Sequence, residues 1–174
     1  RMSVDGIDAS TLLYVPQETV YDFVHEFSGA TDHSPHLDEV RQYGDGDVGT
    51  DYEIEVSWWR LSYVSHTRVT DTDRPRRIDW RTTQAPKARG YWGIKPETPP
   101  AGRDHATRLR LRLQFDPDTL GSVPLGGWTL DRLFDRLRPL VVRESERIVE
   151  GVVRDLEGES RAVELDIHRG PEQV

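Results

Sequence analysis

The chain has 174 residues, a formal net charge of −8 and no cysteine, which excludes disulfides and thiol chemistry. Its length suits one domain with a single core. No stretch approaches the ~18 consecutive apolar residues of a membrane-spanning helix, and no signal peptide opens the chain. We therefore expect a cytoplasmic protein without stable membrane insertion.

The positive charge is almost entirely arginine. Lys87 and Lys95 are the only lysines, against 31 aspartates and glutamates. An acidic, lysine-poor composition resembles that of proteins from salt-loving archaea, although an ordinary acidic protein is the alternative. No basic patch stands out, which argues against nucleic acid and anionic membranes as partners.

The N-terminal part predicts a strand followed by two short helices. Residues 10–15 favour extended structure, and Pro16 ends the strand. An apolar i, i+3, i+4, i+7 face then predicts a helix over residues 16–27. Residues 30–39 are polar and contain a proline, so they predict a second short helix or a structured loop.

Residues 40–115 predict a series of strands, because apolar residues alternate with charged ones as in strands with one buried face. The predicted strands cover residues 40–43, 52–58, 61–70, 78–82, 91–94 and 109–115. Short turns join them, which favours an antiparallel sheet. The outward arginines of the last strand should pair with acidic residues of neighbouring strands.

The turn at residues 44–49 spells GxGxxG. In a dinucleotide site this motif follows a strand and opens a helix, whereas here a second strand follows. Asp45 and Asp47 would also repel a pyrophosphate. We therefore interpret the segment as a hairpin turn, and we expect no cofactor.

The longest predicted element is a helix over residues 128–157. Its apolar face consists of Leu130, Leu133, Phe134, Leu137, Val141, Ile148, Val152 and Leu156. At 1.5 Å per residue it would run roughly 45 Å, enough to lie across a sheet. Pro139 removes a backbone hydrogen bond and should kink the helix, and two helices broken at Pro139 are the alternative.

The last residues turn polar. We divide the chain into a domain at residues 1–160 and a polar tail at residues 161–174. Val163, Leu165 and Ile167 alternate and could add an edge strand or a homodimer contact, but a frayed tail is the preferred interpretation.

A resemblance to a known family is carried by residues 15–24, 69–78 and 107–115, together with the long helix. These segments resemble the START/Bet v 1-like (SRPBCC) superfamily, especially its polyketide cyclase/dehydrase and coenzyme Q-binding branches. The resemblance implies an α+β helix-grip fold: a curved antiparallel sheet of about six to seven strands wrapped around a long C-terminal helix, with two short helices after the first strand. It also implies a cavity between sheet and helix for an apolar or aromatic molecule, but no shared catalytic set.

Aromatic side chains on the apolar strand faces are the candidate ligand contacts. Rings with a polar tip suit a pocket that is mostly apolar with a few polar groups, and plain core packing is the alternative. The predicted ligand-binding residues are Tyr52, Trp58, Tyr63, Trp80, Trp92, Leu111, Phe134, Leu137 and Val141. Hydroxyl groups of the same parity, such as those of Ser65, Thr67 and Thr82, could bond a ligand oxygen or the backbone.

One polar cluster has acid–base or metal-binding chemistry. It comprises His25, His33, His36, Asp32 and Asp38. No dedicated spacing such as HExxH is present, so we expect no metal site. His36 and Asp32 are the catalytic candidates, as a general acid or base near the cavity mouth.

Three functions remain open. The leading hypothesis is binding or transport of a hydrophobic small molecule, such as a lipid, a quinone or a polyketide-like ring. The second is a cyclase or dehydrase enzyme, which needs an inward-facing acid or base that the strand pattern does not show. The third is a protein-interaction module with a collapsed core, which would use Trp59 or the tail.

Overall fold

The computed structural model describes residues 5–26, 37–58, 61–84, 87–116 and 130–171 of the chain. In chain order its elements are β1 (Asp5–Leu13), α1 (Gln17–His25), β2 (Leu37–Tyr43), β3 (Asp51–Trp58), β4 (Leu61–Asp73), β5 (Arg77–Thr82), β6 (Ala88–Pro96), β7 (Thr107–Phe115), α2 (Leu130–Glu157) and β8 (Leu165–Pro171).

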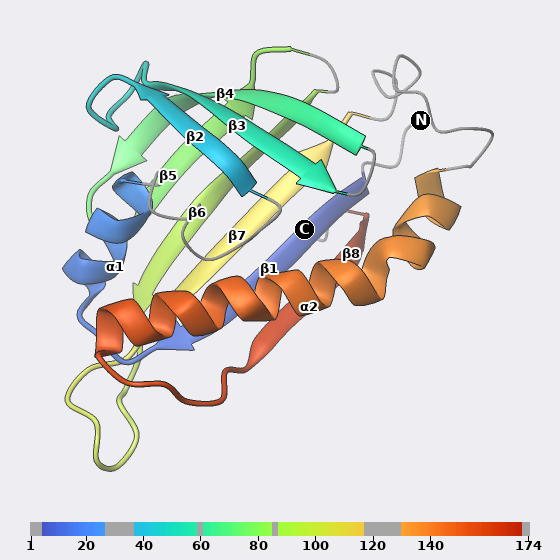
Figure 1. Cartoon of the computed structure of the whole chain (residues 1–174). Helices are drawn as coiled ribbons and strands as arrows, with labels where there is room; N and C mark the ends of the chain where they lie inside the picture. The colour runs from blue at the N-terminus through green and yellow to red at the C-terminus, as the bar shows by residue number, and fades with distance from the viewer. Residues whose placement is uncertain (1–4, 27–36, 59–60, 85–86, 117–129, 172–174) are drawn as a thin grey trace.

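The strands form one eight-stranded sheet in the order β2-β3-β4-β5-β6-β7-β1-β8. All its pairs are antiparallel, and β1 joins the sheet between β7 and β8. Figure 1 shows the sheet curving around one side, where α1 lies at one end and α2 crosses in front of β1 and β8. This architecture confirms the predicted α+β helix-grip fold, with more strands than the six to seven expected.

The additional strand is β8, within the segment predicted to be a frayed tail. It pairs with β1 from Thr11↔Leu165 to Asp5↔Pro171. Pairing satisfies the backbone N–H and C=O groups that β1 would otherwise expose along its edge. The expectation of fraying was therefore wrong for residues 165–171, whereas the division of the chain into domains stays a prediction.

Several strand boundaries differ from those predicted. β1 begins at Asp5 rather than at residue 10, because it pairs with β7 and β8 along this length, and β4 continues to Asp73. β6 extends on both sides of the predicted residues 91–94 because it lies between β5 and β7, and both neighbours hold its glycines in the ladder. β2 begins at Leu37, inside the segment predicted as a second short helix, and residues 30–36 of that segment lie outside the described residues. The GxGxxG segment is the β2–β3 hairpin turn, as predicted.

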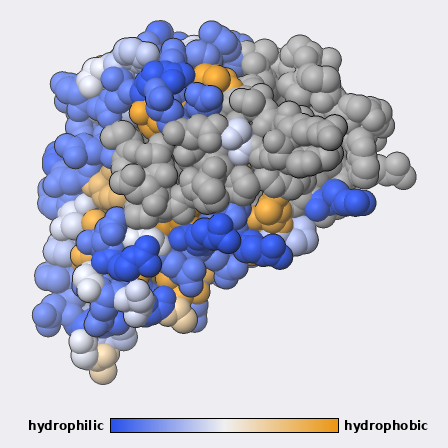
Figure 2. Space-filling view, viewed as in Figure 1, coloured by the Kyte–Doolittle hydropathy of each residue, from blue (hydrophilic) through white to orange (hydrophobic). Residues whose placement is uncertain are grey.

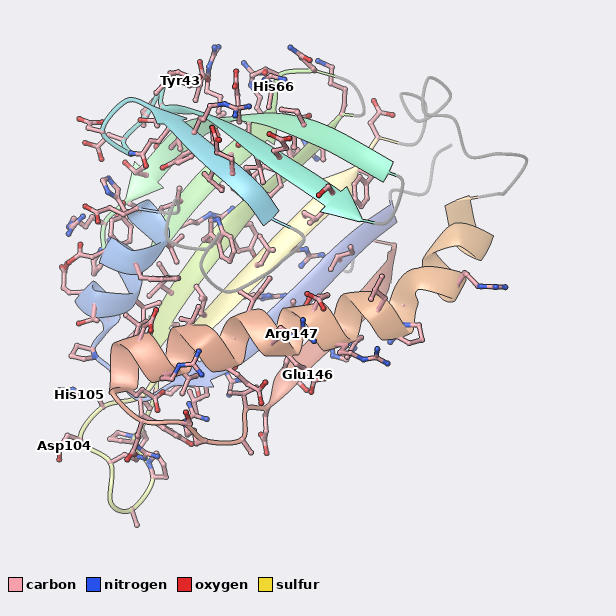
Figure 3. The ribbon with its side chains drawn as sticks, viewed as in Figure 1. Tyr43, His66, Asp104, His105, Glu146 and Arg147 are labelled. Carbon is pink, nitrogen blue, oxygen red and sulfur yellow. The ribbon has the colours of Figure 1, made fainter. Side chains whose placement is uncertain are left out.

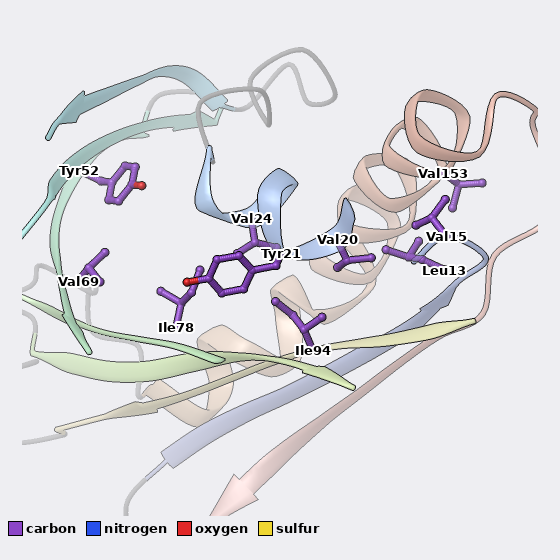
Figure 4. Close-up of a cluster of buried hydrophobic side chains, with 10 residues drawn as sticks. All are labelled: Leu13, Val15, Val20, Tyr21, Val24, Tyr52, Val69, Ile78, Ile94 and Val153. Atoms are coloured by element: carbon purple, nitrogen blue, oxygen red, sulfur yellow. The ribbon is translucent and has the colours of Figure 1, made fainter. Parts of the chain in front are cut away.

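The core lies between the sheet, α1 and the C-terminal half of α2 (Figure 4). Val153 of α2 is fully buried, as are Leu13 of β1 and Val20 of α1. Val153 lies outside the predicted apolar face, next to its member Val152, which is also buried. A face drawn from spacing alone can be misplaced by one residue when the helix packs on two elements at once.

α2 is a single helix with Pro139 inside it, so the alternative of two helices was wrong. Figure 1 shows its first turns at an angle to the rest, as expected from the lost hydrogen bond at a proline. Arg143, Arg147 and Arg154 of this helix are exposed. Figure 3 shows Glu146 and Arg147 on the helix, apart from Tyr43 and His66 at the far side of the sheet.

The outer face of the sheet carries cross-strand ion pairs. Arg110 of β7 pairs with Asp8 of β1, and Arg68 of β4 donates to Asp51 of β3 at 2.7 Å. The hydrogen bond from Arg68 lowers the pKa of Asp51 below its ordinary value. The predicted pairing of the β7 arginines with acidic residues of neighbouring strands is confirmed for Arg110. Figure 2 shows mostly hydrophilic residues on the described surface from this side, with hydrophobic ones in small, separate patches.

One buried ion pair fixes the end of α2. The Glu157 side chain is only 2% exposed and accepts two hydrogen bonds from Arg161, both of 2.8 Å. It also accepts the backbone N–H of Tyr14 at 2.8 Å, while Arg161 donates to the Leu12 carbonyl at 2.9 Å. Burial raises the pKa of Glu157, but the bonds from Arg161 and Tyr14 outweigh it and hold that pKa below its ordinary value.

Glu157→Ala should lower the free energy of unfolding by about 3 kcal/mol, because it leaves the Arg161 charge and the Tyr14 N–H without their acceptor. Urea unfolding followed by circular dichroism measures this. Glu159→Ala is the matched control: its side chain is 65% exposed and lies 3.4 Å from Arg103, so the loss should stay below about 1 kcal/mol. Equal losses in the two variants would contradict the role of the buried pair.

The contribution of Glu157 should depend on pH with a fixed sign. Its lowered pKa means that the ionised form stabilises the fold above the unfolded-state pKa of about 4.3, and that this stabilisation is lost as the pH falls through the folded-state pKa. The stability difference between the wild type and Glu157→Gln should therefore be constant from about pH 7 to 5 and shrink below about pH 4. Urea unfolding across this range tests it, and a difference that persists or grows in acid would contradict it.

Candidate functional site

A cavity of about 490 Å³ opens on the side of the sheet that faces α1. Val24 and His25 of α1 and Gly46 of the hairpin turn contribute to its wall, and the remaining lining residues come from β3 to β7. Most of the lining is aliphatic or aromatic. Such a lining binds apolar surface, and its few polar groups orient the bound molecule.

Four predicted ligand contacts line this cavity: Tyr52, Trp80, Trp92 and Leu111. The side chains of the other five, Trp58, Tyr63, Phe134, Leu137 and Val141, lie outside the described part. No described side chain of α2 belongs to the lining, so the wall that the structure describes is made by α1 and the sheet. The described C-terminal half of α2 instead packs on the core through Val153.

Strand register places rings and hydroxyl groups on the same inner face. Val69 lies opposite Trp80, and Thr67 lies opposite Thr82 and Tyr52 on its two neighbours. Directly opposed residues share a face of the sheet, so these side chains form one wall. The Thr82 hydroxyl accepts the Ala88 N–H at 2.9 Å. Of the two partners considered from the sequence, a ligand oxygen or the backbone, Thr82 therefore bonds the backbone.

Trp80 lies over Gly90 on the adjacent strand. A Cβ at Gly90 would be 2.7 Å from Cζ2 of the indole and 2.2 Å from the Arg112 carbonyl oxygen, so glycine makes the close approach possible. Nε1 of Trp80 is buried and has no hydrogen-bond partner within the described residues. A buried donor of this kind costs about 1–3 kcal/mol until an acceptor reaches it.

His25 forms the polar end of the cavity. Its Nε2 lies 3.1 Å from Oδ1 of Asp47, and its ring stacks on Tyr21 with centroids 5.8 Å apart. The Tyr52 hydroxyl donates to the His25 carbonyl at 3.0 Å. Burial, followed by the charges of Asp45, Asp47 and Glu26, raises the pKa of Tyr52 to about 12, so this hydroxyl stays a donor at neutral pH.

Gly46 makes room for the His25 ring. It is buried with φ of +98°, and a Cβ there would lie 2.5 Å from Cε1 and 2.7 Å from each ring nitrogen. A side chain at this position would strain the turn and also displace the imidazole. The glycine therefore serves both the hairpin and the cavity mouth.

The pairing of His25 with Asp47 was missed from sequence. The histidine was recognised only as a member of the polar cluster, and the aspartate only as part of the turn. Of the predicted catalytic candidates, His36 and Asp32 lie outside the described residues, and so does His33. The one usable signal was the four-residue spacing of Tyr21 and His25, which places two rings on one helix face.

The described ranges contain neither a candidate metal site nor a membrane-spanning helix. No group of three or more histidine, aspartate or glutamate side chains there is arranged to hold a metal ion. Neither described helix is long and apolar enough to cross a membrane.

Comparison with known proteins agrees with this geometry. Residues 13–146 match the family described as "Polyketide cyclase / dehydrase and lipid transport". No curated protein sequence matches the chain. Among solved structures it is similar to the Zhui aromatase/cyclase from Streptomyces sp. R1128, with 22% identity, a TM-score of 0.65, and coverage of 90% of this chain and 96% of that one.

Two other structures have the same fold. A START superfamily protein from Mycobacterium smegmatis has 18% identity and a TM-score of 0.63, with coverage of 87% of this chain and 99% of that one. The di-domain ARO/CYC BexL from the BE-7585A biosynthetic pathway has 16% identity and a TM-score of 0.62, with coverage of 90% of this chain. The chain spans only 50% of the di-domain protein. With the sequence match over most of its length and the helix-grip fold in agreement, the chain belongs to the polyketide cyclase/dehydrase and lipid transport family.

Proposed function

We propose that the protein binds a hydrophobic, ring-containing small molecule in the cavity lined by Trp80, Trp92 and Leu111. The observation that carries this proposal is the cavity itself. Its volume of about 490 Å³ falls within the ~300–1,000 Å³ of small-molecule sites, and its lining is mostly apolar. Family membership supports a hydrophobic ligand, and a polyketide-like ring, a quinone or a lipid would each suit this chemistry.

The two indoles favour a flat ligand within that class. Trp80 and Trp92 lie on adjacent strands, β5 and β6, on the same inner face. Aromatic side chains pack on flat rings in offset or edge-to-face arrangements, each worth about 0.5–1.5 kcal/mol beyond the burial of area. A planar molecule would contact both rings, whereas a flexible acyl chain would lose conformational entropy on entering.

A second candidate function is catalysis of a cyclase or dehydrase type on an aromatic or polyketide-like substrate. It is supported by the family and by the presence of an imidazole, His25, in the cavity wall. His36 and Asp32 stay predictions for this role. A ligand-free interaction module, the third hypothesis, is not supported, because the described core encloses a cavity rather than a fully packed interior.

Native mass spectrometry of protein purified without detergent tests the proposal. A co-purified apolar molecule that is released by organic solvent and carries a ring system is the expected result. The same spectra report whether the chain forms the homodimer considered from its C-terminal sequence. Protein that carries no ligand and binds no member of a panel of quinones, fatty acids and polycyclic phenols would overturn the proposal.

Leu111→Trp should fill the cavity and weaken binding of a fluorescent apolar probe such as 1-anilinonaphthalene-8-sulfonate at least about tenfold, because the new indole occupies space that the probe needs. Probe titration measures this, and circular dichroism verifies the fold. Tyr43→Trp is the matched control, since Tyr43 is 54% exposed and its replacement should leave probe affinity unchanged. Unaltered binding in Leu111→Trp would place the probe outside this cavity.

We also propose that the acidic surface is adapted to high salt, as the lysine-poor composition suggests. At a net charge of −8, repulsion between carboxylates opposes folding, and screening within about 3 Å at 1 M salt relieves it. Dialysis from about 2 M potassium chloride into dilute buffer should therefore reduce the far-ultraviolet circular dichroism signal. A signal that does not change with salt would contradict this adaptation.

A further inference from the structure

We propose that His25, oriented by Asp47, accepts a hydrogen bond from an acidic hydroxyl group, of the phenol or enol type, on the molecule in the cavity. This inference rests on the proposed function, because it names the polar end of the ligand that the cavity would hold. It concerns recognition and requires no proton transfer.

The first argument is that the His25 ring is held in place within the cavity wall. Its side chain is 16% exposed and belongs to the lining. Tyr21 stacks on the ring, and Gly46 lies against a face of the ring, close to Cε1 and both nitrogens. A ring fixed on several sides presents its free nitrogen in one direction, so a hydrogen bond to it loses little side-chain entropy.

The second argument concerns the tautomer. A carboxylate only accepts hydrogen bonds, so the contact between Asp47 and Nε2 places the hydrogen of the neutral imidazole on Nε2. Nδ1 then carries a lone pair. It has no hydrogen-bond partner among the described residues. An acceptor without a partner beside an apolar cavity favours a ligand that brings a donor.

The third argument compares His25 with the other polar groups of the cavity wall. The Tyr52 hydroxyl donates to the His25 carbonyl, and the Thr82 hydroxyl bonds the backbone of Ala88, so neither takes the place of His25 without breaking an existing bond. The buried Nε1 of Trp80 is a donor and not an acceptor. The hydroxyls of Ser65 and Thr67 also line the cavity, but a hydroxyl oxygen is less basic than an imidazole nitrogen and is the weaker acceptor.

The fourth argument is electrostatic and disfavours an anionic group. Asp47 contacts His25 directly, and Asp45, Asp47 and Glu26 all lie close enough to help raise the pKa of Tyr52, so several carboxylates gather at this end of the cavity. A carboxylate or phosphate entering here would be repelled. A neutral hydroxyl is not, and phenols and enols donate stronger hydrogen bonds than aliphatic alcohols because they are more acidic.

The test compares 2-naphthol with 2-methoxynaphthalene, which has the same rings but no donor. Isothermal titration calorimetry gives the dissociation constant of each probe. The wild type should bind 2-naphthol about tenfold more tightly, as expected for one good hydrogen bond. His25→Phe retains a ring for Tyr21 to stack on but has no acceptor, so it should bind both probes with the affinity that the wild type has for 2-methoxynaphthalene.

Asp47→Asn provides a second variant that does not disturb the interior, because the Asp47 side chain is 63% exposed. Without the carboxylate, the hydrogen of the neutral imidazole is no longer held on Nε2, so Nδ1 is an acceptor for only part of the time. The preference for 2-naphthol should therefore fall at least threefold. Asp45→Asn is the matched control: it removes the same charge from the same turn, but the Asp45 side chain accepts the Asp47 N–H and does not bond the His25 ring, so this variant should keep most of the preference.

The outcomes separate the two proposals. Binding of 2-methoxynaphthalene without any preference for 2-naphthol in the wild type would overturn the role of His25 and leave the hydrophobic site intact. A preference that survives in both His25→Phe and Asp47→Asn would also overturn it. Failure of both probes to bind the wild type at all would overturn the hydrophobic site, and the inference with it.

Discussion

The buried pair of Glu157 and Arg161 joins the end of α2 and the segment before β8 to the end of β1, more than 140 residues earlier in the chain. Glu157 ends α2, Arg161 leads into β8, and both bond the backbone after β1 or at its end, at Tyr14 and Leu12. Removing two charges from water is unfavourable, and it is offset here because each charge has several hydrogen bonds. Cation–π contacts with Tyr14 add to the stability of this junction, since Cζ of Arg103 and Cζ of Arg161 each lie 4.3 Å from the centroid of the Tyr14 ring.

The cavity lies away from this junction. The junction holds the C-terminal half of α2 against β1, where Val153 packs beside Leu13 and the core is dense. The cavity instead lies under α1 and the strands from β3 to β7. The molecule thus has one end that is packed by α2 and β1 and another that holds the cavity.

The two faces of the sheet have different chemistry because side chains alternate along each strand. On β7, Leu111 faces the cavity, while its neighbours Arg110 and Arg112 belong to the outer face, where Arg110 pairs with Asp8. The outer arginines therefore place no positive charge in the cavity. The polar groups of the described wall include the hydroxyls of Ser65, Thr67 and Thr82 on β4 and β5 and the imidazole of His25 on α1, which Asp47 of the turn contacts.

Periodicity was sufficient to predict the inner face and insufficient to predict contacts between elements. Tyr52, Trp80, Trp92 and Leu111, which are predicted as ligand contacts, line the cavity, and their position on the inner face follows from the two-face alternation of a strand. β8 was considered only as an alternative to a frayed tail, because an edge strand needs little apolar surface. His25 and Asp47 are separated by 22 residues, and only the folded hairpin brings them together. Their contact depends on the position of the turn, which no local pattern specifies.

Gly46 of the hairpin turn and His25 of α1 depend on each other, because the histidine ring lies where a side chain at Gly46 would be. Because the imidazole of His25 fills the volume that a Cβ would take, neither residue can be exchanged freely on its own. A related chain with alanine or serine in the turn would need a smaller residue at the end of the helix. Paired replacement of these two sites is therefore the pattern that evolution should leave, and designs that reshape the entrance should alter both together.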